Sequence, residues 1–229
     1  MVKVCPSCGR TEREVPFIGF FCRDCYLRDH QLVEVPKLRL KRCPLCGRAY
    51  FSGRWEDFSL DRLRDWLVDH IKVREMQGVQ IGVSFPEVDE DLIRYRAIVR
   101  GTVEGTPVEI PLEGEIPVEK VLCPRCGRAT GGYFQAIIQV RGADVEEHAE
   151  EIARLVEREG GEYAFVSRVE FTKDGIDLYI GSKKVADKVA RKIERRYGIK
   201  AIRSHRLITE IQGKRVYRLT VSLRFPPKD

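Results

Sequence analysis

The sequence contains no asparagine, only two methionines, and no apolar run of the roughly 18–20 residues that a membrane-spanning helix needs. Its first residues, MVKVCPSCGR, contain no apolar signal-peptide segment. These absences favour a soluble, cytoplasmic protein without a membrane partner. The scarcity of thermolabile residues is typical of proteins from hot environments, an interpretation that points to a thermophile.

Catalytic signatures are also missing. The sequence has no glycine-rich phosphate loop, dinucleotide fingerprint or nucleophile elbow, and no His-x-Glu motif of the kind that zinc deaminases place before a cysteine pair. The four histidines stand alone in the sequence, and an isolated histidine is more often structural than a general base. We therefore expect no enzymatic activity and no small-molecule substrate.

The eight cysteines form four pairs, each with two residues between its members. Three of the pairs repeat the phrase Cys-Pro-x-Cys-Gly-Arg. This spacing lets both sulfurs reach one ion at about 2.3 Å. The proline stiffens the turn, and the following glycine accepts a positive φ. Because paired cysteines in a reducing compartment indicate metal rather than disulfides, the pattern predicts zinc.

Four pairs can bind two zinc ions. Sequential pairing gives one site of Cys5, Cys8, Cys22 and Cys25 and another of Cys43, Cys46, Cys123 and Cys126. A cross-braced arrangement stays open on sequence grounds. A closed site of four thiolates leaves no coordination position for water or substrate, so both ions are expected to be structural.

Residues 1–132 are predicted to be a zinc-binding domain with a β-rich insertion at about 79–120. A helix is expected from the N-cap Ser59 to about Gly78, because leucines recur at helical spacing. The insertion is acidic and is expected to face solvent or a protein partner. The first cysteine site is expected to have a small apolar core of Phe17, Phe20, Phe21 and Tyr26.

Residues 133–229 follow Gly131-Gly132 and are predicted to form a second domain. Alternating apolar residues, turn signals and helical spacing give the order β-α-β-β-α-β-β. We expect a two-layer sandwich with both helices on one face of an antiparallel sheet. The fold class is thus α+β, a double zinc-knuckle domain followed by this βαββαββ sandwich.

The second helix of that sandwich, residues 183–197, is strongly basic. Between residues 183 and 224 there are fourteen basic and three acidic side chains. Such a density of positive charge favours contact with a phosphate backbone. No base-reading motif accompanies it, so shape and backbone are the expected targets. The candidate RNA-binding residues are Lys183, Lys184, Lys188, Arg191, Lys192, Arg195 and Arg196.

The stretches CPSCG, FCRDCYLRD, CPLCGRAYFSGRW and CPRCGR, with Trp55 soon after the third cysteine pair, resemble one known family. It is the large-ribosomal-subunit export adaptor family, also called the nonsense-mediated mRNA decay protein three family, which archaea share with eukaryotes. The resemblance is most specific over residues 1–132. It implies that the eight cysteines are zinc ligands.

The resemblance also implies a function. Family members look like factors that bind the large ribosomal subunit at its intersubunit face, contacting ribosomal RNA and a neighbouring anti-association factor. They act in late maturation or oppose premature subunit joining. The present chain has no leucine-rich export segment, so it resembles a short archaeal-type member.

Two other functions stay open. A zinc-ribbon DNA-binding or transcription factor would prefer duplex DNA of defined sequence. A zinc protein-interaction adaptor would be favoured by cross-braced zinc sites.

Overall fold

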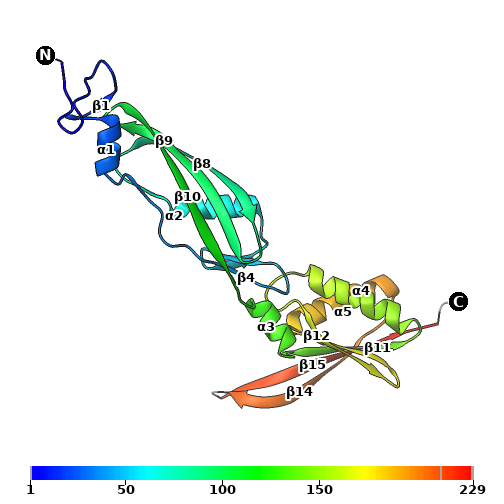
Figure 1. The fold of residues 1–229 in the computed structure, drawn as a ribbon. Helices are drawn as coiled ribbons and strands as arrows, with labels where there is room; N and C mark the ends of the chain where they lie inside the picture. The colour runs from blue at the N-terminus through cyan, green and yellow to red at the C-terminus, as the bar shows by residue number, and fades with distance from the viewer. Residues whose placement is uncertain (1, 212, 228–229) are drawn as a thin grey trace. The chain divides into compact units, whose positions relative to one another are not determined.

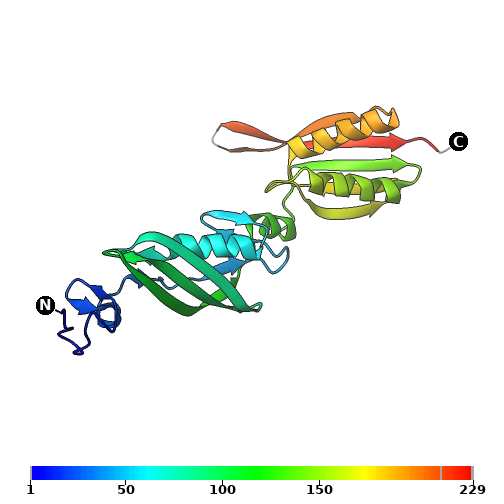
Figure 2. The ribbon, with the colours of Figure 1, turned by 90° about the horizontal axis from the view of Figure 1, so that it is seen from above.

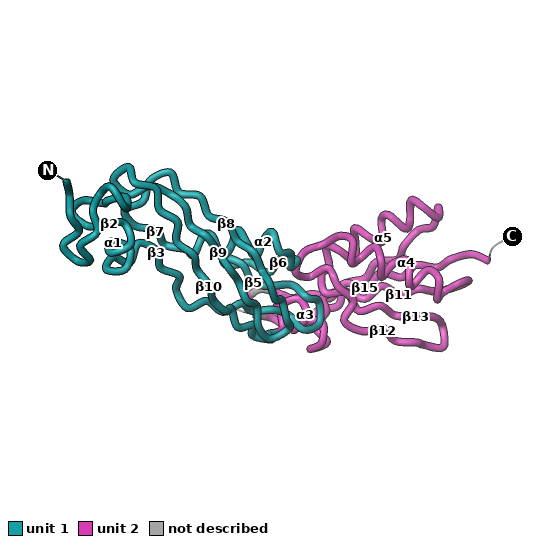
Figure 3. The backbone as a smooth tube through the Cα atoms, turned by 45° about the horizontal axis from the view of Figure 1, so that its top comes forward, with its two compact units in different colours: residues 1–121 teal, residues 122–229 magenta. Residues whose placement is uncertain are grey.

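The computed structural model describes residues 2–211 and 213–227. With 24% of the residues in helices and 44% in strands, the chain is α+β, which confirms the predicted class. It divides into two compact units, unit 1 up to Val121 and unit 2 from Leu122 onward (Figure 3). No helix in the described ranges is long and apolar enough to cross a membrane.

Unit 1 contains a six-stranded sheet in the order β6-β5-β4-β10-β9-β8, with three long strands beside α2 (Figure 1). Two two-stranded sheets, β1-β2 and β3-β7, accompany it. The elements of unit 1 are β1 (Phe17–Ile18), β2 (Phe21–Cys22), α1 (Arg23–Asp29), β3 (Val33–Glu34), β4 (Leu40–Arg42), β5 (Ala49–Phe51), β6 (Arg54–Glu56), α2 (Leu60–His70), β7 (Lys72–Val73), β8 (Gln77–Val88), β9 (Leu92–Val103) and β10 (Thr106–Lys120).

Helix α2 begins where the sequence predicts and ends earlier. The side chain of Ser59 accepts a hydrogen bond from the amide of Arg62 at 3.2 Å, which confirms the predicted N-cap. The predicted end near Gly78 is wrong, because Ile71 is extended and β7 pairs with β3. Leu63, Trp66 and Leu67 are buried in the core of unit 1, so the helix is held by its apolar face.

The predicted β-rich insertion is a sheet of long strands. Its last strand, β10, runs without a break over fifteen residues, from Thr106 to Lys120. Its three prolines at 107, 111 and 117 are an even number of residues apart, so their nitrogens lie on one side of the strand. The amide of Val118 donates to the backbone carbonyl of Asp91, on the side of β10 where β9 lies. Because successive amides point to opposite sides of a strand, the proline nitrogens point away from β9. The prolines therefore remove no hydrogen bond from the β9–β10 pairing.

Unit 2 contains a five-stranded sheet in the order β12-β13-β11-β15-β14, with α4 and α5 on one face (Figure 2). The predicted order β-α-β-β-α-β-β is confirmed. A short helix, α3 (Pro124–Thr130), precedes it. The elements are β11 (Ala136–Gly142), α4 (Val145–Arg158), β12 (Val166–Thr172), β13 (Gly175–Ile180), α5 (Lys183–Tyr197), β14 (Ile202–Ile211) and β15 (Lys214–Phe225).

The expectation of an antiparallel sheet is wrong at one pair of strands. Strand β15 pairs with β11 in parallel over seven positions, from Ala136 to Gly142. The reason is topological, because the chain passes through α5 to the edge strand β14 and returns through a hairpin beside β11. Buried residues from both helices and the sheet, including Ile138, Ile152, Val189 and Leu223, form the core.

Candidate metal centres and basic surface

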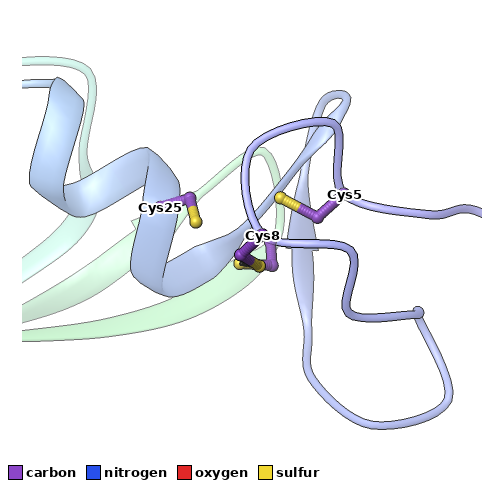
Figure 4. A group of neighbouring side chains, drawn as sticks. Cys5, Cys8 and Cys25 are labelled. Carbon is purple, nitrogen blue, oxygen red and sulfur yellow. Dashed lines mark hydrogen bonds between the residues drawn. The ribbon is translucent and has the colours of Figure 1, made fainter.

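The first cysteine cluster brings together the sulfurs of Cys5, Cys8, Cys22 and Cys25, all within 4.8 Å of one another. Cys5 and Cys8 lie on a loop and Cys25 on α1 (Figure 4). The Sγ atoms of Cys8 and Cys22 are 3.5 Å apart. Four sulfurs bonded tetrahedrally to zinc at about 2.3 Å lie roughly 3.8 Å from one another, whereas a disulfide needs about 2.05 Å. The cluster therefore fits zinc.

The second cluster consists of Cys43, Cys46, Cys123 and Cys126, whose sulfurs also lie within 4.8 Å of one another. Both donor sets contain four cysteines and suit structural zinc, so two zinc ions are the expected cofactors. The structure selects the sequential pairing that the sequence left open beside cross-bracing.

Two parallel strands deliver the ligands of the second cluster. Strand β4 pairs with the end of β10, with Leu40 opposite Val118 and Arg42 opposite Lys120. The amide of Val121 adds a hydrogen bond of 3.0 Å to the carbonyl of Arg42. Because parallel strands end at the same edge of a sheet, β4 ends directly before Cys43 and β10 ends two residues short of Cys123 at that same edge. The insertion thus returns to the point where it began.

The cysteine pairs have two local geometries. Gly9 and Gly47 have φ values of 76° and 74°, as predicted. The amide of each glycine donates a hydrogen bond of 2.9 Å to the backbone carbonyl of the first cysteine of its pair. The same expectation is wrong at Gly127, which lies inside α3. There Cys123 is the N-cap and accepts from the amide of Cys126 at 3.4 Å. Each cluster therefore combines a turn-type pair with a pair at a helix start.

The surroundings of the first cluster act in opposite directions on two of its thiols. A hydrogen bond with the backbone of Cys25 lowers the pKa of Cys22, but burial and hydrogen bonds with the other cysteine side chains outweigh it and raise that pKa to about 12. At Cys5 the surroundings favour the thiolate. Burial raises the pKa of Cys5, but hydrogen bonds with the backbone of Cys22, Ser7 and Cys8 outweigh that effect and bring the pKa down to about 6. Groups that stabilise a thiolate also favour metal binding.

The predicted apolar core at this cluster is only partly formed. Phe17 and Phe21 pack against the buried cysteines. Tyr26 packs against the larger core of unit 1 instead, and Phe20 is 83% exposed.

The seven predicted RNA-binding residues all lie on α5, but their surroundings differ. Lys188 and Lys192 both form ion pairs with Glu159, whose side chain is only 6% exposed. The hydrogen bond from Lys188, followed in size by the one from Lys192, lowers the pKa of Glu159. Arg196 pairs with Glu151 of α4 at 2.6 Å. These three cations are therefore partly neutralised by carboxylates.

The other side of α5 faces strands β14 and β15. Lys183, Lys184 and Arg191 line a cavity of about 610 Å³ there, together with residues of the two strands. Sequence reasoning missed Arg203, His205 and Tyr217 in this cavity. The sequence shows that Arg203 and His205 alternate along a predicted strand. Which face of the sheet they share with Tyr217, and whether α5 lies over that face, depends on how the strands are ordered in the sheet. Arg195 donates to the carbonyl of Arg191 at 3.2 Å.

Two four-cysteine clusters within an α+β fold define this chain as a zinc-binding protein of the multi-knuckle type. The model of the NMD3 N-terminal domain matches residues 5–131, and that of the NMD3 second domain matches residues 133–225. The chain belongs to the NMD3 family, which is known for ribosome-related roles. No curated protein matches the sequence.

Proposed function

We propose that this chain is a non-enzymatic, cytoplasmic factor that binds the large ribosomal subunit. It acts in late subunit maturation or opposes premature joining of the small subunit. The observation that carries the proposal is membership of the NMD3 family along nearly the whole chain. Its partners are ribosomal RNA and a protein neighbour, an anti-association factor, at the subunit interface.

The zinc clusters support a binding role rather than chemistry. When four thiolates hold a zinc ion, no position is left for a water nucleophile or a substrate oxygen. Such an ion stabilises the fold, because the ligands must be brought together for it to bind. The residues around both clusters therefore serve to present a rigid surface.

The two units differ in the charge that they offer a partner. On the long sheet of unit 1, arginines of β9 pair across to glutamates of β10: Arg94 with Glu115 at 3.0 Å, Arg96 with Glu113 at 3.0 Å and Arg100 with Glu109 at 2.7 Å. These cations are internally neutralised, so this sheet suits solvent or a protein partner. The basic α5 region of unit 2 is the part of the chain suited to RNA.

Sedimentation with separated ribosomal subunits tests the proposal. The chain is expected to pellet saturably with large subunits and not with small subunits, and the bound fraction should fall as salt increases because phosphate contacts release counterions. Small subunits serve as the matched control, since they also expose RNA. Equal binding to both subunits, or to neither, would overturn the proposal. Preferential binding to duplex DNA would favour a transcription factor instead.

A further inference from the structure

Two neighbouring cavities lie along one end of α5 and the hairpin of β14 and β15. The first, of about 610 Å³, is lined by side chains of these three elements, among them Lys183, Lys184, Arg191, Arg203, His205 and Tyr217. The second, of about 300 Å³, shares Lys183 and Tyr217 with the first. The two cavities therefore adjoin at these two residues, and together they are called the track.

The first cavity is cationic. Four of its side chains are lysine or arginine and one is aspartate. Arg203 is fixed by Asp187 at 2.8 Å and by Glu194 at 2.7 Å. Arg191 also pairs with Asp187, at 2.9 Å. The positive charge available to a ligand is therefore chiefly that of Lys183 and Lys184. Lys183 donates to the carbonyl of Tyr217 at 3.1 Å, which leaves its charge without a carboxylate. The side chains of Lys184 and His205 form no hydrogen bond or ion pair with any residue that the structure describes.

The second cavity is aromatic. Tyr133, Phe134 and Tyr217 contribute to its lining, and the first and last of these are 39% and 37% exposed. The guanidinium of Arg218 lies 3.8 Å above the ring of Phe134. Aromatic faces beside a cationic groove are the combination that binds single-stranded nucleic acid, since bases stack on the rings while phosphates meet the cations.

We propose that this track binds a single-stranded segment of RNA, with phosphates in the cationic cavity and bases against Tyr217 and Tyr133. The inference rests on the proposed ribosomal function and narrows it to one side of α5. Lys188 and Lys192 line neither cavity; they are engaged by Glu159 and contribute to the packing of α5 near the end of α4 rather than to RNA.

Matched pairs of substitutions on the same helix test this assignment. Lys183→Gln with Lys184→Gln removes two charges from the track, and Lys188→Gln with Lys192→Gln removes two charges beside Glu159, outside the track. Binding of a short fluorescent oligouridine is measured by anisotropy across a salt series. The track variant should bind roughly tenfold more weakly, and its salt slope should fall by about 0.7 for each phosphate that the variant no longer neutralises. The control variant should bind within about twofold of the wild type, because its charges touch no phosphate.

A third variant separates stacking from charge. Tyr217→Ala is expected to weaken binding roughly tenfold with an unchanged salt slope, because base stacking carries no counterion release. Thermal melts of each variant check that the fold is intact, and the control variant is expected to melt lower than the track variant.

Several outcomes would overturn the inference. If the track and control variants lose affinity for oligouridine equally, RNA binding belongs to the whole of α5 and not to the track. Competition by polyglutamate as strong as by RNA would make the cavity a general polyanion site. If the wild type does not bind oligouridine, the inference is wrong. Sedimentation with ribosomal subunits decides separately whether the proposed function is correct.

Discussion

Replacing Gly114 with alanine should destabilise unit 1, because Tyr95 lies across it. The two residues are opposite each other in the β9–β10 pairing. A Cβ at residue 114 would lie 2.5 Å from the Oη of Tyr95 and 2.6 Å from its Cζ, far inside normal van der Waals separation. Tyr95 is 7% exposed and packs in the core, so its ring has little room to move.

The expected magnitude combines two opposing effects. Alanine in place of glycine within a strand ordinarily stabilises by roughly 0.5–1 kcal/mol, since the unfolded chain loses freedom. Forcing a buried side chain aside costs typically about 1–3 kcal/mol. The net expectation for Gly114→Ala is a loss of about 1–2 kcal/mol in the free energy of unfolding.

Urea denaturation measures this loss, and Gly82→Ala in β8 is the matched control. A Cβ at residue 82 meets nothing within 4 Å, so that change should be neutral or slightly stabilising. In a Tyr95→Ala background, Gly114→Ala should cease to be harmful, giving a coupling energy of about 1–3 kcal/mol. The reasoning is refuted if Gly114→Ala costs no more than Gly82→Ala.

Three further changes probe the zinc sites and the ion pairs. Cys43→Ser should lower the zinc content from two ions per chain to one and lower the melting temperature; elemental analysis that still finds two ions would contradict the site. Glu159→Gln should be less stable than the wild type at neutral pH, and the difference should shrink in acid. The reason is that a carboxylate whose pKa is lowered by folding stabilises the protein only while it is ionised, above that pKa. A difference in stability that persists unchanged in acid would contradict the role of the ionised carboxylate. Asp177→Ala leaves the guanidinium of Arg141, 12% exposed, without its carboxylate and should cost about 3–5 kcal/mol in urea melts. Replacing both Asp177 and Arg141, by Leu and Met, should lower the free energy of unfolding by less than Asp177→Ala does. An equal loss would show that the unpaired charge of Arg141 is not what makes Asp177→Ala harmful.

Much of the local structure follows from short-range pattern. The hydroxyl of Ser59 marks the start of α2, and the apolar stripe of Val189 and Ile193 predicts α5 with its observed bounds. The order β-α-β-β-α-β-β in unit 2 follows from alternation and turn residues. The identity of the eight cysteines as metal ligands follows chiefly from their spacing, because two intervening residues place both sulfurs within reach of one ion.

Other features depend on contacts between residues far apart in the sequence. Helix α2 stops at His70 because β7 finds a partner in β3, although the helical spacing continues to Ile71. Strand β10 continues through Gly114 because its backbone pairs with β9 on both sides of that residue, whereas a glycine between prolines is by itself typical of a break.

The metal sites and the basic surface show the same division. The sequence determined that this chain carries four zinc-binding pairs and one cationic helix. Only the tertiary structure decided that Cys43 shares a site with Cys123, since that requires β4 to lie beside β10. Likewise, the packing of the helices decides that Lys188 and Lys192 meet the carboxylate of Glu159, whereas the ammonium group of Lys183 meets, within the described part of the chain, only the carbonyl of Tyr217.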